Sequence, residues 1–136
     1  MIVVDTNVLG YLYFPSDLNS NVEKLQERER DWIAPVLWKS EFLNVAALYY
    51  RRKLITLPET VEAFEKANEF VITFDIHSEY KDIFALIASS ACSSYDCEFV
   101  SLAKSLAIKL ITYDKQILQE FSGLALKPED YLVQLK

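Results

Sequence analysis

Two aspartates follow closely after apolar runs, where a carboxylate can bind a ligand. Asp5 follows Ile2-Val3-Val4, and Asp114 follows Leu110-Ile111-Thr112 with one residue between. Both runs predict short strands buried on both faces, and ligands of parallel sheets bind outside the carboxyl ends of the strands. If these two strands are parallel neighbours in one sheet, Asp5 and Asp114 lie on the same edge. The alternative is that each aspartate only caps the helix that follows it.

Glu41 is unusual because apolar residues surround it at helical spacing. These neighbours are Leu37, Trp38, Val45 and Leu48. A carboxylate on the buried face of a helix is paired, protonated or bound to a metal, because burying it alone costs several kcal/mol. A structural salt bridge remains the alternative, but Lys39 and Arg52 of the same helix lie on other faces. Asn44, one turn after Glu41, adds a second polar group to the apolar stripe.

Asp96 lies in the first turn of a predicted helix. Ser93, three residues earlier, forms a Ser-x-x-Asp pattern with it that is similar to a capping box. Taken alone, Asp96 is therefore explained as a residue that stabilises the helix dipole. Glu98 stands two residues further on, nearly opposite on the helix, and is expected to face the solvent.

If the fold brought them together, the four acidic residues would repel one another. They are Asp5, Glu41, Asp96 and Asp114. At separations of about 6 Å and an effective dielectric constant of about 20, the repulsion is roughly 3 kcal/mol per pair. A cation is then required. Oxygen ligands without a His or Cys cluster indicate a hard ion, Mg²⁺ or Mn²⁺, and carboxylate-held Mg²⁺ typically meets substrate phosphates.

Composition limits the other possibilities. A net charge of −6 argues against a protein that holds nucleic acid through a broad basic surface, so any such contact must be local or metal-assisted. Cys92, Cys97 and the single histidine, His77, match neither a disulfide framework nor a zinc site, and His77 is given no catalytic role. Neither a membrane span nor a secretory signal is recognisable, so a cytoplasmic location is expected.

Short β-rich runs alternate with helical patterns along the chain. Strands are predicted at 2–4, 31–34, 71–74 and 110–112. Helices are predicted at 7–14, 18–30, 36–53, 60–70, 76–91, 93–107, 115–121 and 130–135. This alternation predicts an α/β fold in a single domain, 1–136. We expect a three-layer α/β/α sandwich with a short, mainly parallel sheet of four or five strands.

Four stretches that contain these acids resemble the four acidic motifs of the PIN-domain superfamily. They are Val4-Asp5-Thr6-Asn7-Val8-Leu9, Ser40-Glu41-Phe42-Leu43-Asn44, Ser94-Tyr95-Asp96-Cys97-Glu98-Phe99-Val100-Ser101-Leu102-Ala103 and Leu110-Ile111-Thr112-Tyr113-Asp114. Each is weak alone, but four in order over nearly the whole chain are fairly specific. Their order and spacing are most similar to the VapC-type toxin ribonucleases of toxin–antitoxin pairs.

The resemblance implies a PIN-like fold and a Mg²⁺- or Mn²⁺-dependent endoribonuclease, the toxin of a type II pair. Asp5, Glu41, Asp96 and Asp114 would then hold one or two ions, supported by Thr6, Asn7 and Thr112. The implied partners are an RNA substrate, a small cognate antitoxin protein and a second copy of the chain in a homodimer, with no membrane. One departure is Ala107, at a place after the Asp96 helix where family members often have Gly.

Two other functions remain open from the sequence. The first is a PIN-like protein-binding module without catalytic activity, which purified protein that binds Mn²⁺ yet cuts no RNA would favour. The second is a phosphotransfer domain of the receiver or haloacid-dehalogenase kind. Receivers use paired acids and a lysine at a later strand end, and haloacid dehalogenases use Asp-x-Asp after the first strand. Asp5-Thr6-Asn7 supplies neither pattern of acids.

Overall fold

The computed structural model describes residues 1–75 and 80–136. Within these residues five short strands form one parallel sheet in the order β3-β2-β1-β4-β5. The strands are β1 (Ile2–Val4), β2 (Trp32–Pro35), β3 (Ile72–Phe74), β4 (Leu110–Ile111) and β5 (Ala125–Leu126). The predicted α/β class and the four or five strands are confirmed. Strand β5 lies in the tail, where only a short helix was expected.

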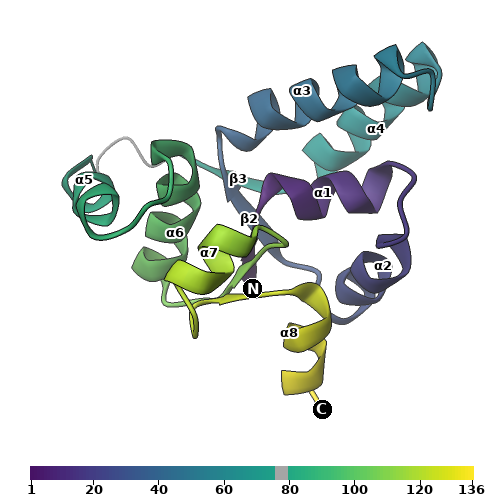
Figure 1. Ribbon diagram of the computed structural model, residues 1–136. Helices are drawn as coiled ribbons and strands as arrows, with labels where there is room; N and C mark the ends of the chain where they lie inside the picture. Colours follow the sequence, from purple (N-terminus) through teal and green to yellow (C-terminus); the bar gives the residue numbers. More distant parts are fainter. Residues whose placement is uncertain (76–79) are drawn as a thin grey trace.

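Helices cover both faces of the sheet, as predicted. The described residues form α1 (Thr6–Tyr13), α2 (Asn19–Arg28), α3 (Trp38–Arg51), α4 (Leu57–Phe70), α5 (Tyr80–Ser89), α6 (Ser94–Leu106), α7 (Lys115–Glu120) and α8 (Pro128–Gln134). Helices α5, α6 and α7 lie on one side, and α1, α2 and α8 lie on the other (Figure 1). Helices α3 and α4 pair with each other and extend over the upper edge of the sheet.

The direction of chain progression reverses between β1 and β4. The chain runs from β1 outward to β2 and β3, then returns to β4 on the other side of β1 and continues to β5. Val3 pairs with Leu110 and Val4 with Ile111, so the two central strands end side by side. Such a switch point opens a crevice at the carboxyl ends of the strands. This is the upper edge in Figure 1, where α1 begins.

An aromatic cluster fixes helix α3 over this edge. The ring of Phe42 is fully buried and contacts the rings of Phe14, Tyr13, Trp38 and Phe64. These rings come from α1, α3, α4 and the residue after α1, and large aromatic side chains contribute much of the burial energy of a core. Because Glu41 precedes Phe42, the cluster also holds Glu41 in place.

Several element boundaries differ from the prediction. Helix α4 begins at Leu57 because Thr56 and Glu59 form a capping box, with Pro58 tolerated in the first turn. Pro35 continues β2 beside Phe74 instead of ending the strand before it. The predicted start of a helix at Ile76, and His77 within it, lie outside the described residues.

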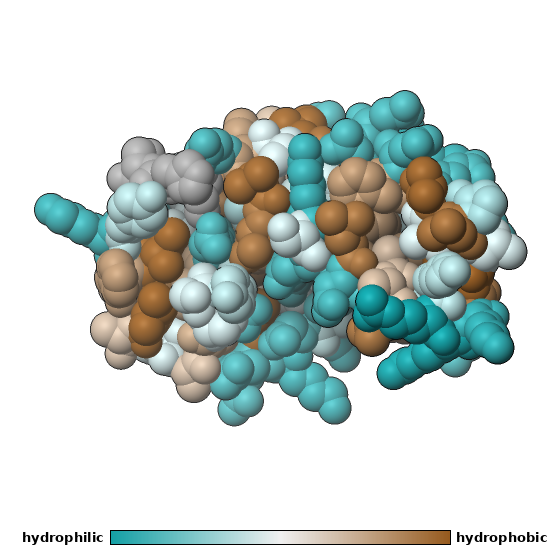
Figure 2. Space-filling model, turned by 90° about the horizontal axis from the view of Figure 1, so that it is seen from above, coloured by the Kyte–Doolittle hydropathy of each residue, from teal (hydrophilic) through white to brown (hydrophobic). Residues whose placement is uncertain are grey.

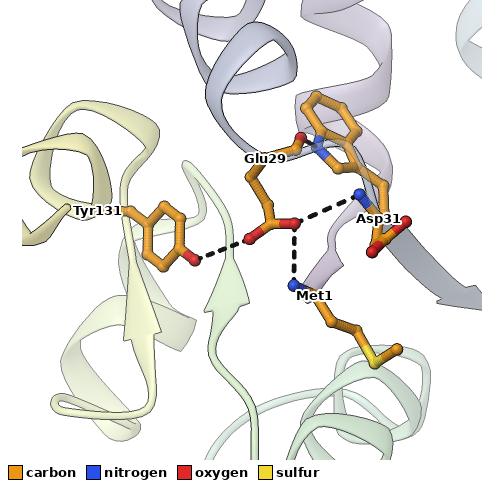
Figure 3. Close-up of polar contacts among 5 residues, drawn as sticks. Met1, Glu29, Asp31 and Tyr131 are labelled. Atoms are coloured by element: carbon orange, nitrogen blue, oxygen red, sulfur yellow. Dashed lines mark hydrogen bonds and ion pairs between the residues drawn. The ribbon is translucent and has the colours of Figure 1, made fainter.

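Glu29 joins the end of α2 to the C-terminal helix (Figure 3). Its carboxylate accepts a hydrogen bond from the Tyr131 hydroxyl at 3.2 Å and from the Asp31 amide at 3.3 Å. It also forms an ion pair with the amino group of Met1 at 2.9 Å. The backbone carbonyl of Glu29 accepts a hydrogen bond from the indole of Trp32 at 2.7 Å. These contacts fix α8 against the beginning of the sheet.

The surface seen from above shows apolar side chains in separate patches with hydrophilic side chains between them (Figure 2). None of the helices in the described part of the chain is both long enough and apolar enough to cross a membrane.

Candidate active site

A cavity of about 520 Å³ opens at the switch point. Side chains from the residues after β1 and β4, from the beginnings of α1 and α6, and from the first two turns of α3 line it. The lining residues are Asp5, Thr6, Asn7, Leu37, Ser40, Glu41, Asn44, Val45, Tyr95, Asp96 and Asp114. The structure therefore places all four acids singled out from the sequence around one cavity.

Asp5 is the innermost of the four acids, with only 8% of its surface exposed. It caps α1, because its Oδ1 accepts a hydrogen bond from the Thr6 amide at 2.8 Å. Its Oδ2 accepts one from the Thr112 hydroxyl at 2.8 Å, and its backbone amide donates to the Ile111 carbonyl at 2.9 Å. Asp5 is therefore both a helix cap and a cavity residue, so the two readings of this position do not exclude each other.

Thr112 and Asn7 connect the two strand ends. The fully buried Thr112 hydroxyl donates to Asp5 and accepts a hydrogen bond from the Asp114 amide at 2.9 Å. The side-chain oxygen of Asn7 accepts a hydrogen bond from the Tyr113 amide at 3.2 Å. These contacts set the backbone of the β4 end relative to the start of α1.

Glu41 reaches the cavity from the first turn of α3. Its Oε1 accepts a hydrogen bond from the Thr6 hydroxyl at 2.8 Å, which links α3 to the end of β1. The salt bridge considered from the sequence is not formed: among the described residues no Lys or Arg pairs with Glu41. A threonine hydroxyl, not a cation, is its partner.

Asp96 lies in the first turn of α6 and Asp114 directly before α7, and both helices begin at the cavity. Ser93 caps α6, with its hydroxyl accepting a hydrogen bond from the Asp96 amide at 3.1 Å. Asp114 caps α7, with its Oδ1 accepting a hydrogen bond from the Ile117 amide at 2.9 Å. Both helix-stabilising roles expected from the sequence are present, and both side chains also line the cavity.

Burial, with a smaller contribution from the charges of Glu41 and Asp96, raises the pKa of Asp5 from an ordinary value of 3.8 to about 7, although hydrogen bonds from Thr112 and Thr6 lower it. Burial also raises the pKa of Glu41, with a contribution from Asp96. The pKa of Asp96 is raised by burial and by the charge of Asp114. The acids thus disfavour one another's ionised forms.

The donor set of this cavity suits a divalent ion. Within the described residues no cationic side chain pairs with any of the four acids, so their charges are not compensated by the chain itself. Among the described residues, no group of three or more acidic, His or Cys side chains is placed so that it could hold a metal ion directly. Mg²⁺, however, keeps several waters when bound, so carboxylates that stand apart can hold it. All-oxygen donors of negative charge fit Mg²⁺ or Mn²⁺.

The PIN domain family model matches residues 2–123. The chain belongs to the PIN domain family. A curated relative, Ribonuclease VapC3 from Pyrobaculum aerophilum, is 29% identical over 126 residues, which cover 90% of this chain and 96% of that protein.

Solved structures agree on the PIN domain fold. PAE2754 from Pyrobaculum aerophilum superposes with a TM-score of 0.74 at 18% identity, over 98% of this chain and 93% of that one. A toxin-antitoxin complex from Klebsiella pneumoniae superposes with a TM-score of 0.72 at 15% identity, over 94% of this chain and 98% of that one. FitAcB from Neisseria gonorrhoeae superposes with a TM-score of 0.66 at 17% identity, over 95% of this chain and 99% of that one.

One prediction about this PIN domain's acids is wrong. Glu98 was expected to face the solvent, but it is only partly exposed and its charge raises the pKa of Glu41. Separation by two residues turns a side chain about 200° around a helix. Glu98 accordingly does not line the cavity, and its charge acts on Glu41 through space. Ser40 and Tyr95 are cavity residues that received no role from the sequence, although each stands beside one of the acids.

Proposed function

We propose that this PIN domain is a Mg²⁺- or Mn²⁺-dependent endoribonuclease and the toxin of a type II toxin–antitoxin pair. The observation that carries the proposal is the cavity that four carboxylates line without a cationic partner in the described chain. Such an arrangement is unfavourable unless a divalent ion binds. The name of the relative, Ribonuclease VapC3, supports RNA as the substrate.

Each residue of the cavity has a distinct part in this proposal. Asp5, Glu41, Asp96 and Asp114 would hold one or two ions. Thr112 and Thr6 would orient two of these carboxylates through the hydrogen bonds that they donate, to Asp5 and Glu41 respectively. Asn7 would keep the end of β4 in register with α1 through its bond to the Tyr113 amide. Supporting contacts of this kind tune the affinity of metal sites.

The reaction is the hydrolysis of an RNA phosphodiester bond. Mg²⁺ or Mn²⁺ held by these four carboxylates would lower the pKa of a water and offset negative charge on the phosphate. The protein orients the RNA so that attack occurs in line with the departing 3′ oxygen, which leaves a 5′-phosphate and a 3′-hydroxyl. One of these carboxylates would accept the proton that the attacking water loses, and the leaving 3′ oxygen would take up a proton from solvent.

Two partners belong to the same proposal. A small antitoxin protein would bind this chain and block its activity, which the toxin-antitoxin complex among the structural neighbours supports. A second copy of the chain would form a homodimer. Size-exclusion chromatography with light scattering tests the dimer, and co-purification with the product of a short neighbouring reading frame tests the antitoxin.

The cleavage experiment uses purified protein, synthetic RNA and added Mg²⁺. We expect Asp5→Asn and Asp96→Asn to abolish cleavage while circular dichroism still shows a folded protein. Asp17→Asn, at an exposed position outside the cavity, is the matched control and should cut as the wild type does. Wild-type rates in both cavity variants would reject the proposal. Wild-type protein that binds Mn²⁺ yet cuts no RNA would favour a protein-binding module instead.

A further inference from the structure

Tyr95 stands at the mouth of the cavity with an available ring. It precedes Asp96 on α6, lines the cavity and is 58% exposed. Among the described residues no other aromatic ring packs against it, although most aromatic side chains of this chain lie in or against the core. An exposed ring beside a catalytic carboxylate has a free face on which a flat group can stack.

Asn44 lies on a second wall of the same cavity. It belongs to α3, one helical turn after Glu41, and its side chain is exposed. The carboxamide carries one acceptor and two donors, the set that reads the edge of a nucleobase. Tyr95 therefore offers a stacking surface and Asn44 offers hydrogen bonds, each beside a different acid of the site.

The charge of the cavity determines how it can hold RNA. None of its lining residues is Lys or Arg, and the chain as a whole carries a net charge of −6. Ion pairing with phosphates, the usual source of affinity for nucleic acid, is therefore absent from the cavity lining. The lining therefore favours contacts with the bases as a source of further affinity. Stacking on an aromatic ring supplies about 1–3 kcal/mol per base.

We propose that Tyr95 and Asn44 form a base-binding subsite, in which Tyr95 stacks on a nucleobase next to the scissile phosphate and Asn44 hydrogen-bonds its edge. This rests on the proposed ribonuclease function and assigns its substrate contacts. It follows that the base must be unpaired, because in an A-form duplex the neighbouring bases cover its faces and its partner occupies its Watson–Crick edge.

The test measures binding separately from cleavage. Fluorescence anisotropy follows a short unstructured fluorescein-labelled RNA in Ca²⁺, with a gel to verify that it stays intact. We expect Tyr95→Ala to weaken binding by about 5- to 150-fold, the range that stacking of one base gives, and Tyr95→Phe to bind nearly as the wild type does. Tyr80→Ala is the control, because Tyr80 is also exposed, at 59%, but lies outside the cavity.

Asn44→Ala tests the edge contact. It should bind homopolymeric RNAs of the four bases with more nearly equal affinities than the wild type does. In the cleavage assay Tyr95→Ala should raise KM more than it lowers kcat, and its Mn²⁺ affinity should equal that of the wild type.

Two results would contradict the proposed subsite. One is that Tyr95→Ala binds the single-stranded RNA as tightly as the wild type does. The other is that the wild type binds the single strand and the corresponding duplex with equal affinity. If the wild type binds through Tyr95 but cuts no RNA, the ribonuclease proposal fails while the subsite stands.

Discussion

The Thr112 hydroxyl donates a hydrogen bond of 2.8 Å to Oδ2 of Asp5 and so joins the carboxyl ends of β4 and β1. The two residues are 107 positions apart in the chain. Because the same hydroxyl also accepts a hydrogen bond from the Asp114 amide, one buried side chain orients two of the four acids. The site therefore depends on the register of two central strands as much as on the acids themselves.

Replacing Thr112 by Val keeps the shape of the side chain and removes this hydroxyl. We expect Thr112→Val to lower the affinity for Mn²⁺ by about 10- to 100-fold, the usual effect of losing a contact that orients a metal ligand. Calorimetric titration with Mn²⁺ measures it. Thr60→Val is the control, because the Thr60 hydroxyl only donates to the Thr56 carbonyl within α4. Equal affinities in the two variants would show that Thr112 does not support the site.

The raised pKa of Asp5 predicts an unusual dependence of stability on pH in metal-free protein. The carboxyl holds its proton up to about pH 7 in the folded chain but, at its ordinary value of 3.8, releases it much earlier when unfolded. The folded state then binds more protons between these values, so the free energy of unfolding falls as pH rises toward 7. We expect a loss of roughly 2–4 kcal/mol in denaturant titrations with a chelator present.

Asp5→Asn should flatten this pH dependence and stabilise the metal-free protein above neutral pH, whereas Asp17→Asn should leave it unchanged. Added Mn²⁺ should oppose the trend, because it binds the ionised carboxylates. A wild-type stability that stays constant or rises from acidic to neutral pH without metal would contradict the assigned electrostatics of the cavity.

The sequence predicted most of this site because three signals were local. Buried runs located Asp5 and Asp114 at strand ends, and an apolar stripe made Glu41 conspicuous. Asp96 was different: its local pattern explains a helix cap completely, and only the resemblance to a family placed it in a site. The hydrogen bond from Thr6 to Glu41 depends on how α3 lies over β1, which no spacing encodes. Glu98 was predicted to face the solvent but is half-buried, because helical spacing gives the direction of a side chain and not how far neighbouring elements cover it.

The end of helix α6 predicts a stabilising substitution. Ala107 adopts a left-handed conformation with φ of 55°, and the next amide, of Ile108, donates back to the Ala103 carbonyl at 3.1 Å. A Cβ in this conformation costs about 1–2 kcal/mol, partly offset by the greater freedom of Gly in the unfolded chain. We expect Ala107→Gly to raise the free energy of unfolding by about 0.5–1 kcal/mol.

Ala85→Gly is the opposite control, because Ala85 is exposed within α5 and Gly inside a helix is destabilising by about 0.5–1 kcal/mol. Thermal unfolding of the wild type and both variants measures the two changes in stability. Destabilisation by Ala107→Gly would show that the left-handed turn carries no strain.

Glu29 predicts a stability effect far from the cavity. Burial raises its pKa, but hydrogen bonds and the positive charge of the amino group of Met1 outweigh this and hold the pKa below its ordinary value of 4.5. Its stabilisation is therefore present above the unfolded pKa and is lost as pH falls through the folded one. We expect Glu29→Ala to cost about 1–3 kcal/mol at neutral pH, measured by urea unfolding. Glu27→Ala, exposed on the same helix, should change stability by less than about 0.5 kcal/mol. Equal stabilities would refute a role for Glu29 in holding α8.

Calorimetric titration of the wild type and Asp5→Asn with Mn²⁺, slightly above neutral pH, tests the central claim most directly. If the four carboxylates form one ion site, the wild type binds Mn²⁺ with one or two ions per chain, and Asp5→Asn binds it far more weakly while remaining folded. If the wild type takes up no more Mn²⁺ than Asp5→Asn does, these acids do not hold a divalent ion, and the metal-dependent nuclease assignment is contradicted.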